Sequence, residues 1–239
     1  GDGAITRHGL EEYVSDCVIA LDNRVEDQLA VRRIRVVKLR GSAHGGNEYP
    51  FLINGTGFSV VPVTAFDLAH VAPSETVSTG IPDLDAMLGG GGWYRGSTTM
   101  ISGESGTGKT TFAAHFADAA CRRGERCLFL AFEESEAQIV RNMGSVGLDL
   151  RRWVTQRTLR IHATRPTQTG LESHLTELYA QVRDFEPDIV IIDPVTDFTG
   201  IGTAVDVKAM LMRIVDYLKT QQITAVFTSL VHEPGGVCD

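Results

Sequence analysis

Two patterns of hydrophobic and polar positions divide this chain of 239 residues. Before residue 63, apolar residues form short runs or alternate with polar ones, which is typical of β-strands. Val14–Leu21 is one apolar run, and Val31–Arg40 alternates in part. Phe51–Ile53 and Phe58–Val61 flank a short Asn- and Gly-containing sequence that is typical of a hairpin turn. We therefore predict an antiparallel β meander in this part of the chain.

From Ser97 onward, apolar strand-like runs alternate with segments whose apolar residues recur at helical spacing. Strands are predicted at Thr98–Ser102, Cys127–Phe132, Leu159–Ala163, Ile189–Ile192 and Ile223–Leu230. Helices are predicted after the first of these strands, from about Ser135, over Leu171–Phe185 and over Val207–Leu218. Because strands that alternate with helices build parallel sheets, the fold class is α/β. Residues 63–80 are predicted to link the two parts.

A glycine-rich motif lies between the first parallel strand and its helix. Gly103–Thr110 matches G-x-x-x-x-G-K-[ST], the phosphate-binding loop, whose glycines let backbone N–H groups surround a phosphate. Lys109 supplies a positive charge for the β- and γ-phosphates, and the Thr110 hydroxyl is suited to ligate Mg²⁺. The predicted cofactors are ATP and Mg²⁺, and the predicted nucleotide-binding residues are Gly103, Ser105, Gly106, Thr107, Gly108, Lys109, Thr110 and Thr111.

Three acidic residues follow buried strands and are candidates for the chemistry. Asp193 ends an apolar strand and is expected to reach the Mg²⁺ region, usually through water; the alternative is a cap of the turn before Pro194. Glu133 and Glu134 follow the second parallel strand, where a carboxylate could orient or deprotonate water or approach the metal. The equal alternative is that both charges complement the helix dipole.

Composition narrows the classes of function. The net charge of −8 does not favour non-specific nucleic-acid binding, and no apolar run is long enough to span a bilayer. No signal peptide is visible, so a cytoplasmic location is expected. One basic run lies at residues 32–40, and charge alone favours reading it as a solvated strand face.

The motifs together resemble the RecA-type domains of the KaiC family, the circadian-clock ATPases. The matching segments are Thr79–Asp85, Gly89–Gly92, Gly103–Thr111, Phe132–Ser135, Gln138–Asn142, Gly147–Asp149 and Ile189–Asp193. The N-terminal part is similar to a different region of the same family, the closing strands of the first of its two tandem domains. The predicted domains are therefore 1–72, a closing β segment, and 73–239, a RecA-like P-loop ATPase domain that lacks its own closing strands. This order fits a circularly permuted domain or a fragment of a two-domain protein.

The resemblance implies a homo-oligomeric ring, a hexamer, with ATP at each subunit interface. One subunit would supply the loop with Glu133, Glu134 and Asp193. Its neighbour would contribute residues of the closing strands, which here are Arg32, Lys38, Leu39, Arg40, Ser42 and His44. Clock or signalling proteins are the implied partners. Val146 stands where the second family domain has a Trp near the adenine, so weaker base stacking is expected.

The expected activity is slow hydrolysis of Mg·ATP. Lys109, Glu133 and Glu134 are the predicted catalytic residues, and Thr110, Glu133 and Asp193 the predicted metal-site residues. The resemblance adds Ser/Thr autophosphorylation in the parent protein. Two other classes stay open: a nucleotide-gated signalling scaffold with negligible turnover, and a RecA-like DNA-dependent ATPase. The acidic net charge argues against the second.

Overall fold

The computed structural model of the chain describes residues 14–26, 29–54, 57–60, 73–166 and 170–231. Its backbone forms two compact units, one of residues 1–65 with 172–177 and the other of residues 66–171 with 178–239. The domain boundary predicted between residues 72 and 73 falls at the edge of a stretch outside the described residues. The division into domains 1–72 and 73–239 therefore stays a prediction.

The first unit contains an antiparallel meander, as the sequence predicts. Its strands follow the order β1-β2-β3-β4, with bounds β1 Cys17–Glu26, β2 Leu29–Leu39, β3 Tyr49–Asn54 and β4 Gly57–Val60. The strand predicted at Val14–Leu21 is misplaced, since β1 begins at Cys17 and continues through polar residues. Asp22 pairs with Arg33 and Asn23 with Arg32. An edge strand accepts such polar positions because its exposed side chains keep their contact with water.

The second unit is built on a five-stranded parallel sheet, which confirms the predicted α/β class. The strand order is β7-β11-β10-β8-β9, with bounds β7 Thr98–Gly103, β8 Cys127–Ala131, β9 Leu159–Ala163, β10 Ile189–Asp193 and β11 Thr224–Leu230. Every residue of β8 and β10 is buried. Both strands are therefore covered on two faces, which explains their continuous apolar sequences.

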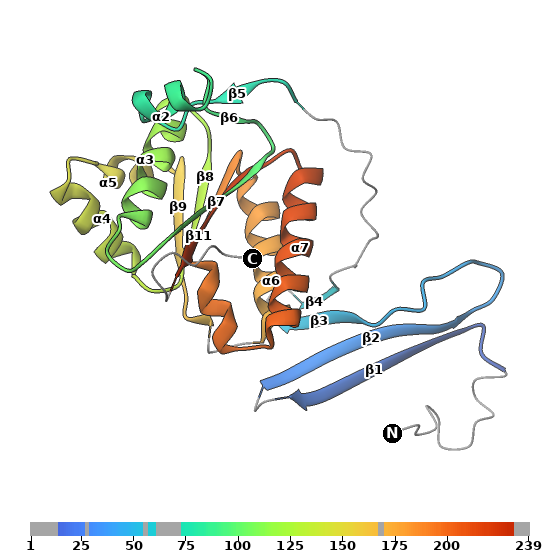
Figure 1. Cartoon of the computed structure of the whole chain (residues 1–239). Helices are drawn as coiled ribbons and strands as arrows, with labels where there is room; N and C mark the ends of the chain where they lie inside the picture. The colour runs from blue at the N-terminus through green and yellow to red at the C-terminus, as the bar shows by residue number, and fades with distance from the viewer. Residues whose placement is uncertain (1–13, 27–28, 55–56, 61–72, 167–169, 232–239) are drawn as a thin grey trace. The chain divides into compact units, whose positions relative to one another are not determined.

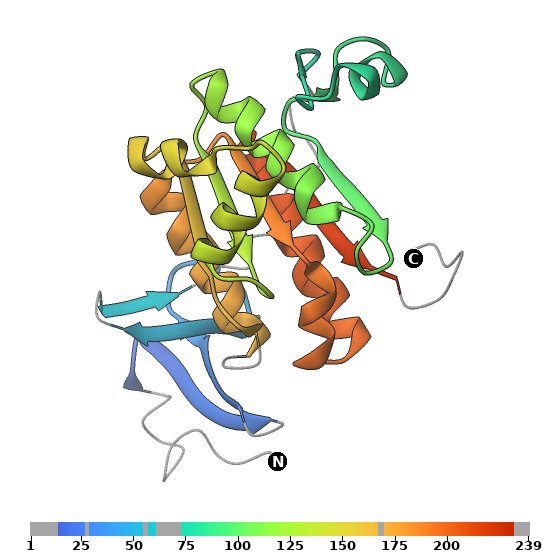
Figure 2. The same ribbon diagram turned by 90° about the vertical axis from the view of Figure 1, so that its left-hand side faces the viewer.

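Helices cover the two faces of this sheet (Figure 1). α3 (Lys109–Arg122), α4 (Glu136–Ser145) and α5 (Leu150–Gln156) lie on one side, and α6 (Leu171–Phe185) and α7 (Ala204–Thr220) on the other. The main core lies between the sheet and the first helical layer, where Phe116, Phe129, Ile139, Leu150 and Ile191 are buried. The same layers are visible after a rotation of 90° (Figure 2).

Short elements were not predicted. They are α2 (Pro82–Met87), α5, the two-stranded ladder of β5 (Thr76–Val77) with β6 (Trp93–Tyr94), and the 3₁₀ helix η2 (Val195–Gly200). β5 falls in the segment predicted as a linker. Elements this short have too few turns or alternations for periodicity to identify them, so tertiary contacts determine them.

One buried polar cluster fixes α5 against α3. Asp118, which is 5% exposed, accepts a hydrogen bond of 2.7 Å from the Trp153 indole Nε1 and pairs with Arg122 at 2.6 Å. The Arg152 guanidinium stacks on Trp153, 3.9 Å from the ring centroid. Because a buried carboxylate is costly unless it is paired and hydrogen-bonded, these contacts favour the observed position of α5 against α3.

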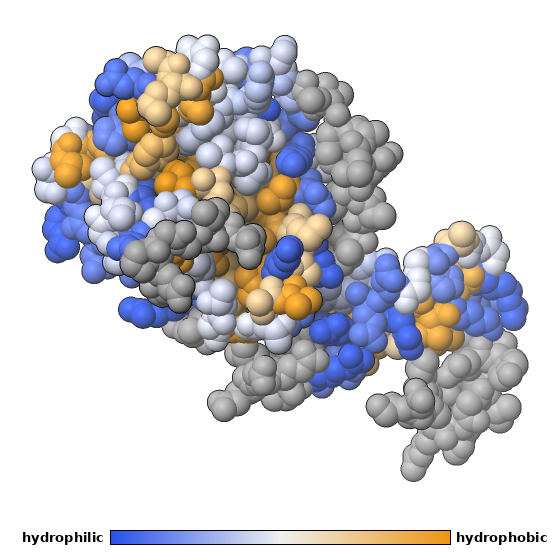
Figure 3. Space-filling view, in the orientation of Figure 1, coloured by the Kyte–Doolittle hydropathy of each residue, from blue (hydrophilic) through white to orange (hydrophobic). Residues whose placement is uncertain are grey.

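The surface mixes hydrophilic and hydrophobic residues (Figure 3). On α2, the adjoining turn and β6, the exposed large apolar residues are Met87, Leu88 and Tyr94. Within the part of the chain that the structure describes, no helix is long and apolar enough to cross a membrane.

Candidate nucleotide-binding site

The glycine-rich loop joins β7 to α3 at the carboxyl edge of the sheet. Gly106 and Gly108 have φ angles of +79° and +91°. Residues other than glycine adopt this left-handed backbone conformation only at a cost in free energy. The Lys109 ammonium donates hydrogen bonds to the backbone oxygens of Gly103 (2.9 Å) and Glu104 (2.7 Å). Its charge is therefore held beside the N-terminus of α3, where an anion is favoured.

Strand order brings a carboxylate beside this loop. β11 lies between β7 and β10, with Leu230 in register with Gly103 and Ile192 with Phe227. Asp193, at the end of β10, is 8% exposed and accepts a hydrogen bond from the Thr228 hydroxyl. Thr228 is fully buried. The bond fixes one Asp193 oxygen and leaves the carboxylate aimed at the end of the sheet where the loop lies.

The two adjacent glutamates have different surroundings. The backbone N–H of Phe132 donates to the backbone carbonyl oxygen of Asp193 at 3.0 Å, so the chain entering Glu133 is tied to the end of β10. Glu134 is half-buried and accepts a 2.8 Å hydrogen bond from the Asn142 side-chain amide. Ser135 then caps α4 in a reciprocal capping box with Gln138. Both glutamates precede this cap, and the acidic residue in the first turn of α4 is Glu136. The helix-dipole interpretation of Glu133 and Glu134 therefore stays an alternative.

The surroundings of Glu133 raise its pKa. Partial burial, then the carboxylates of Asp197 and Asp193, raise the pKa of Glu133, and the Lys109 ammonium acts against this shift. Asp197 lies in η2, which is held by the Thr196 hydroxyl accepting from the Leu230 N–H at 3.2 Å. Burial and then Asp193 likewise raise the pKa of Asp197. Asp197 was not identified from the sequence because no motif marks it.

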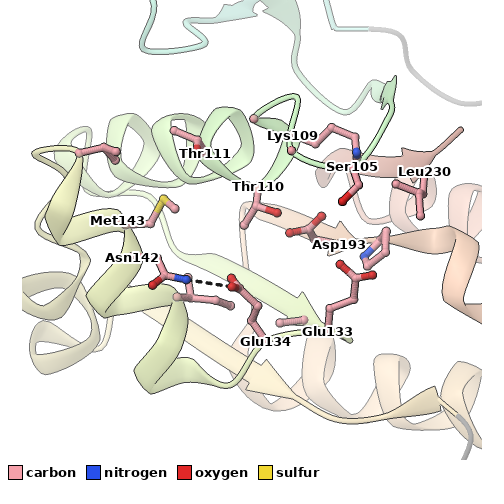
Figure 4. Close-up of a pocket in the computed structure, with 16 residues that line it drawn as sticks. Ser105, Lys109, Thr110, Thr111, Glu133, Glu134, Asn142, Met143, Asp193 and Leu230 are labelled. Carbon is pink, nitrogen blue, oxygen red and sulfur yellow. Dashed lines mark hydrogen bonds between the residues drawn. The ribbon is translucent and has the colours of Figure 1, made fainter. Parts of the chain in front are cut away.

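A cavity of about 370 Å³ lies between the glycine-rich loop, the two glutamates and Asp193 (Figure 4). Of the predicted site residues, it is lined by Ser105, Gly106, Gly108, Lys109, Thr110, Thr111, Glu133, Glu134 and Asp193. Gly103 and Thr107 belong to the loop but do not line the cavity. Gly103 accepts from Lys109, and the Thr107 hydroxyl donates to the Glu104 oxygen at 2.8 Å.

One wall of the cavity comes from α4 and its C-cap residue Val146, and of its residues only Val146 was expected, from the family resemblance, to lie near the adenine. Ile139, Asn142, Met143 and Val146 line it, at the three- and four-residue spacing of one helix face. Val146 is 55% exposed, so part of this wall is open to solvent. A mostly apolar wall is suited to a flat base, whereas the loop is suited to phosphates. Helical spacing in Gln138–Val146 was the signal that could have revealed the wall.

The oxygen donors present fit Mg²⁺. The Thr110 hydroxyl and the Asp193 carboxylate both line the cavity, and Mg²⁺ is typically held by one or two such groups together with water and substrate phosphates. Among the described residues, no group of three or more His, Cys, Asp or Glu side chains forms a separate metal site. The predicted metal role of Glu133 stays a prediction.

The basic residues predicted to act across an interface belong to the first unit. Arg32, Lys38 and Leu39 lie on β2, and Arg40, Ser42 and His44 follow it in exposed positions. Arg40 forms an ion pair of 3.0 Å with Asp16 of its own unit. The cavity in the second unit is lined by none of these residues, and their contribution to a site stays a prediction.

A parallel α/β sheet with this loop at the carboxyl end of one strand is the architecture of the P-loop nucleotide-binding proteins, and the chain is of that class. A family model described as "ATPase: KaiC" matches residues 1–65 and 77–236. The chain therefore belongs to the KaiC family of ATPases, and the resemblance inferred from its motifs is confirmed.

Curated relatives agree with this assignment. The chain is 52% identical over 230 residues to the circadian clock protein KaiC2 of Synechocystis sp., covering 96% of this chain and 40% of the relative. It is 35% identical to the circadian clock oscillator protein KaiC of Synechococcus elongatus, covering 95% of this chain and 44% of the relative. The chain thus spans less than half the length of these relatives.

Proposed function

We propose that this chain binds Mg·ATP in the cavity between the glycine-rich loop and α4 and hydrolyses it slowly. The supporting observation is that one cavity combines a phosphate-binding loop, the ammonium of Lys109 and two kinds of carboxylate, a buried one at Asp193 and an accessible one at Glu133. Membership of an ATPase family supports the same proposal.

In the proposed reaction, the loop amides and Lys109 hold the β- and γ-phosphates. Glu133 accepts a proton from a water molecule as its oxygen forms a bond to the γ-phosphorus. The bond between that phosphorus and the β,γ-bridging oxygen breaks, which gives ADP and inorganic phosphate. Lys109 stabilises the negative charge that develops on the leaving oxygen. Mg²⁺, held near Thr110 and Asp193, would supply further neutralisation of phosphate charge.

We also propose that the chain assembles into a ring, with Lys38 and Arg40 of one copy acting at the nucleotide of the next. This rests on the family resemblance and on the position of both residues at the end of β2. Charges supplied across an interface stabilise phosphates and couple assembly to nucleotide. Phosphoryl transfer to a Ser or Thr of a neighbouring subunit is proposed for the longer parent protein alone.

Two measurements on the purified chain test these proposals. Phosphate release with Mg·ATP is expected to exceed the release without Mg²⁺, and to be unchanged by single-stranded DNA. Light scattering is expected to show a shift to a hexamer when Mg·ATP is added. Nucleotide binding without phosphate release would instead support the alternative function, a nucleotide-gated signalling scaffold with negligible turnover. A monomer under both conditions would remove the role of Lys38 and Arg40 across an interface.

The pH dependence of kcat/KM gives a further prediction. Because a general base must be deprotonated and the pKa of Glu133 is raised, activity is expected to fall at a higher pH than an ordinary glutamate would give. Asp197→Asn removes a neighbouring negative charge and so lowers the pKa of Glu133. The acid limb of the profile should therefore move to lower pH.

The matched control is Asp184→Asn, which removes a carboxylate that is 72% exposed and pairs with Arg160. It should leave the acid limb in place. Equal shifts in both variants would show that net charge, and not the Asp197–Glu133 pair, sets the profile.

A further inference from the structure

One side chain of α4, that of Asn142, lines the cavity and also forms a hydrogen bond with the carboxylate of Glu134. Asn142 lines the cavity on the same helix face as Ile139, Met143 and Val146. Its amide nitrogen Nδ2 lies 2.8 Å from Oε1 of Glu134, the contact drawn as a dashed line in Figure 4. Both side chains are half-buried. A hydrogen bond to a charged acceptor, partly shielded from water, is strong enough to fix the direction of the acceptor.

A second contact determines which end of the amide faces Glu134. Arg141 donates to the Asn142 oxygen Oδ1 from Nε (3.2 Å) and Nη2 (3.1 Å). A guanidinium can only donate, and a carboxylate can only accept. The opposite orientation of the amide would place its NH₂ against the guanidinium and its oxygen against the carboxylate. Arg141 and Glu134 therefore favour the same orientation of Asn142.

The backbone on both sides of this contact is also held. The Ser135 N–H donates to the Gln138 side-chain oxygen at 2.9 Å, which ties the residue after Glu134 to the first turn of α4. The Ser145 hydroxyl donates to the Asn142 backbone oxygen at 2.6 Å. Asn142 lies within α4, and Glu134 directly precedes its capping residue, so hydrogen bonds of the same helix hold the backbone on both sides of the contact.

We propose that Arg141 and Asn142 form a relay that positions Glu134 for ATP hydrolysis. The relay keeps one oxygen of Glu134 bound to α4 and holds that carboxylate apart from Glu133, which remains accessible for water. Because Asn142 also belongs to the α4 wall of the cavity, it links the wall expected to contact the base with the carboxylates near the phosphates. Asn142 is a positioning residue, and the proposal rests on the hydrolytic function proposed above.

The main test is Asn142→Asp, which keeps the shape of the side chain but replaces the donor with a negative charge facing Glu134. We expect kcat to fall about tenfold, since a charge-assisted hydrogen bond becomes a like-charge contact. In a Glu134→Gln background, the glutamine amide can donate to Asp, so the same Asn142→Asp change should have little effect on kcat. An equal loss of kcat in both backgrounds would overturn the relay, because independent sites give additive effects.

A readout that does not need turnover separates this inference from the proposed function. In ¹⁵N-labelled protein, the Asn142 side-chain amide resonances are identified by their absence from the Asn142→Asp spectrum. They are expected to shift in Glu134→Gln and in Arg141→Met, but not in the control Glu136→Gln on the first turn of α4. Resonances unmoved by Glu134→Gln would contradict the contact. Shifted resonances in a chain that releases no phosphate would instead reject the proposed hydrolysis.

Arg141 provides the last arm of the test. Arg141→Lys retains a cationic donor and should keep kcat within about threefold of the original value, whereas Arg141→Met removes every donor and should lower kcat further. Fluorescent-ATP affinity should be similar in the two variants, because the change acts through Glu134 and not through the phosphates. A fall in affinity with unchanged kcat would assign Arg141 to nucleotide binding and overturn its place in the relay.

Discussion

Lys109→Ala is expected to weaken Mg·ATP binding by about 100-fold or more and to reduce hydrolysis to background. Hydrogen bonds to charged groups contribute about 1.5–3 kcal/mol each, and Lys109 would make more than one of them to the β- and γ-phosphates. The ammonium now donates to two loop carbonyls. These contacts show that it lies within the loop and does not extend into solvent.

The measurement is a titration with a fluorescent ATP analogue, followed by phosphate release at saturating nucleotide. Lys219→Ala is the matched control. Lys219 lies exposed in the last turn of α7, and its substitution removes the same positive charge. Circular dichroism should be unchanged in both variants. If Lys109→Ala binds Mg·ATP as tightly as the original chain, the cavity at the glycine-rich loop is not the nucleotide site.

Glu133→Gln is expected to lower kcat about 100- to 1,000-fold while leaving nucleotide affinity unchanged within a few-fold. General-base catalysis contributes about 10²–10⁴ to a rate, and glutamine keeps the size of the side chain but cannot accept the proton from water. Glu133 is the better candidate for this role because its pKa is raised, mainly by burial, and because Glu134 is already bound to Asn142.

Single-turnover phosphate release, with binding measured in parallel, checks this prediction. Glu136→Gln is the control, because it removes the same charge from an exposed position on the adjacent helix. Comparable losses in the two variants would mean that charge near α4, and not proton transfer, limits the rate. An unchanged rate in Glu133→Gln would eliminate Glu133 as the general base and favour the nucleotide-gated signalling scaffold.

The family could be recognised from the sequence because its strongest signals are local. The phosphate-binding loop is one continuous segment whose glycines and lysine have their roles irrespective of the rest of the fold. The parallel strands were also found, since β8 and β10 are buried on both faces and so read as apolar runs. The helix predicted from about Ser135 is α4, which begins at Glu136 with Ser135 as its cap.

Other predictions depended on contacts that sequence spacing does not specify. β1 extends through Asp22 and Asn23 because β2 supplies backbone partners there, although the residues themselves are not typical of strands. α5 is only seven residues long and depends on the buried pair of Asp118 and Trp153. Periodicity predicts an element only when the element is long enough to repeat.

The sequence by itself determined the fold class, the family and the glycine-rich loop that is expected to bind phosphate, because each is encoded by neighbouring residues. Only the tertiary structure decided the composition of the cavity. The order β7-β11-β10-β8-β9 brings Asp193 and Glu133 to the loop, and packing of α4 adds Asn142. Strand order and helix packing arise from long-range burial of apolar surface, which leaves no local signature of which polar side chains will meet.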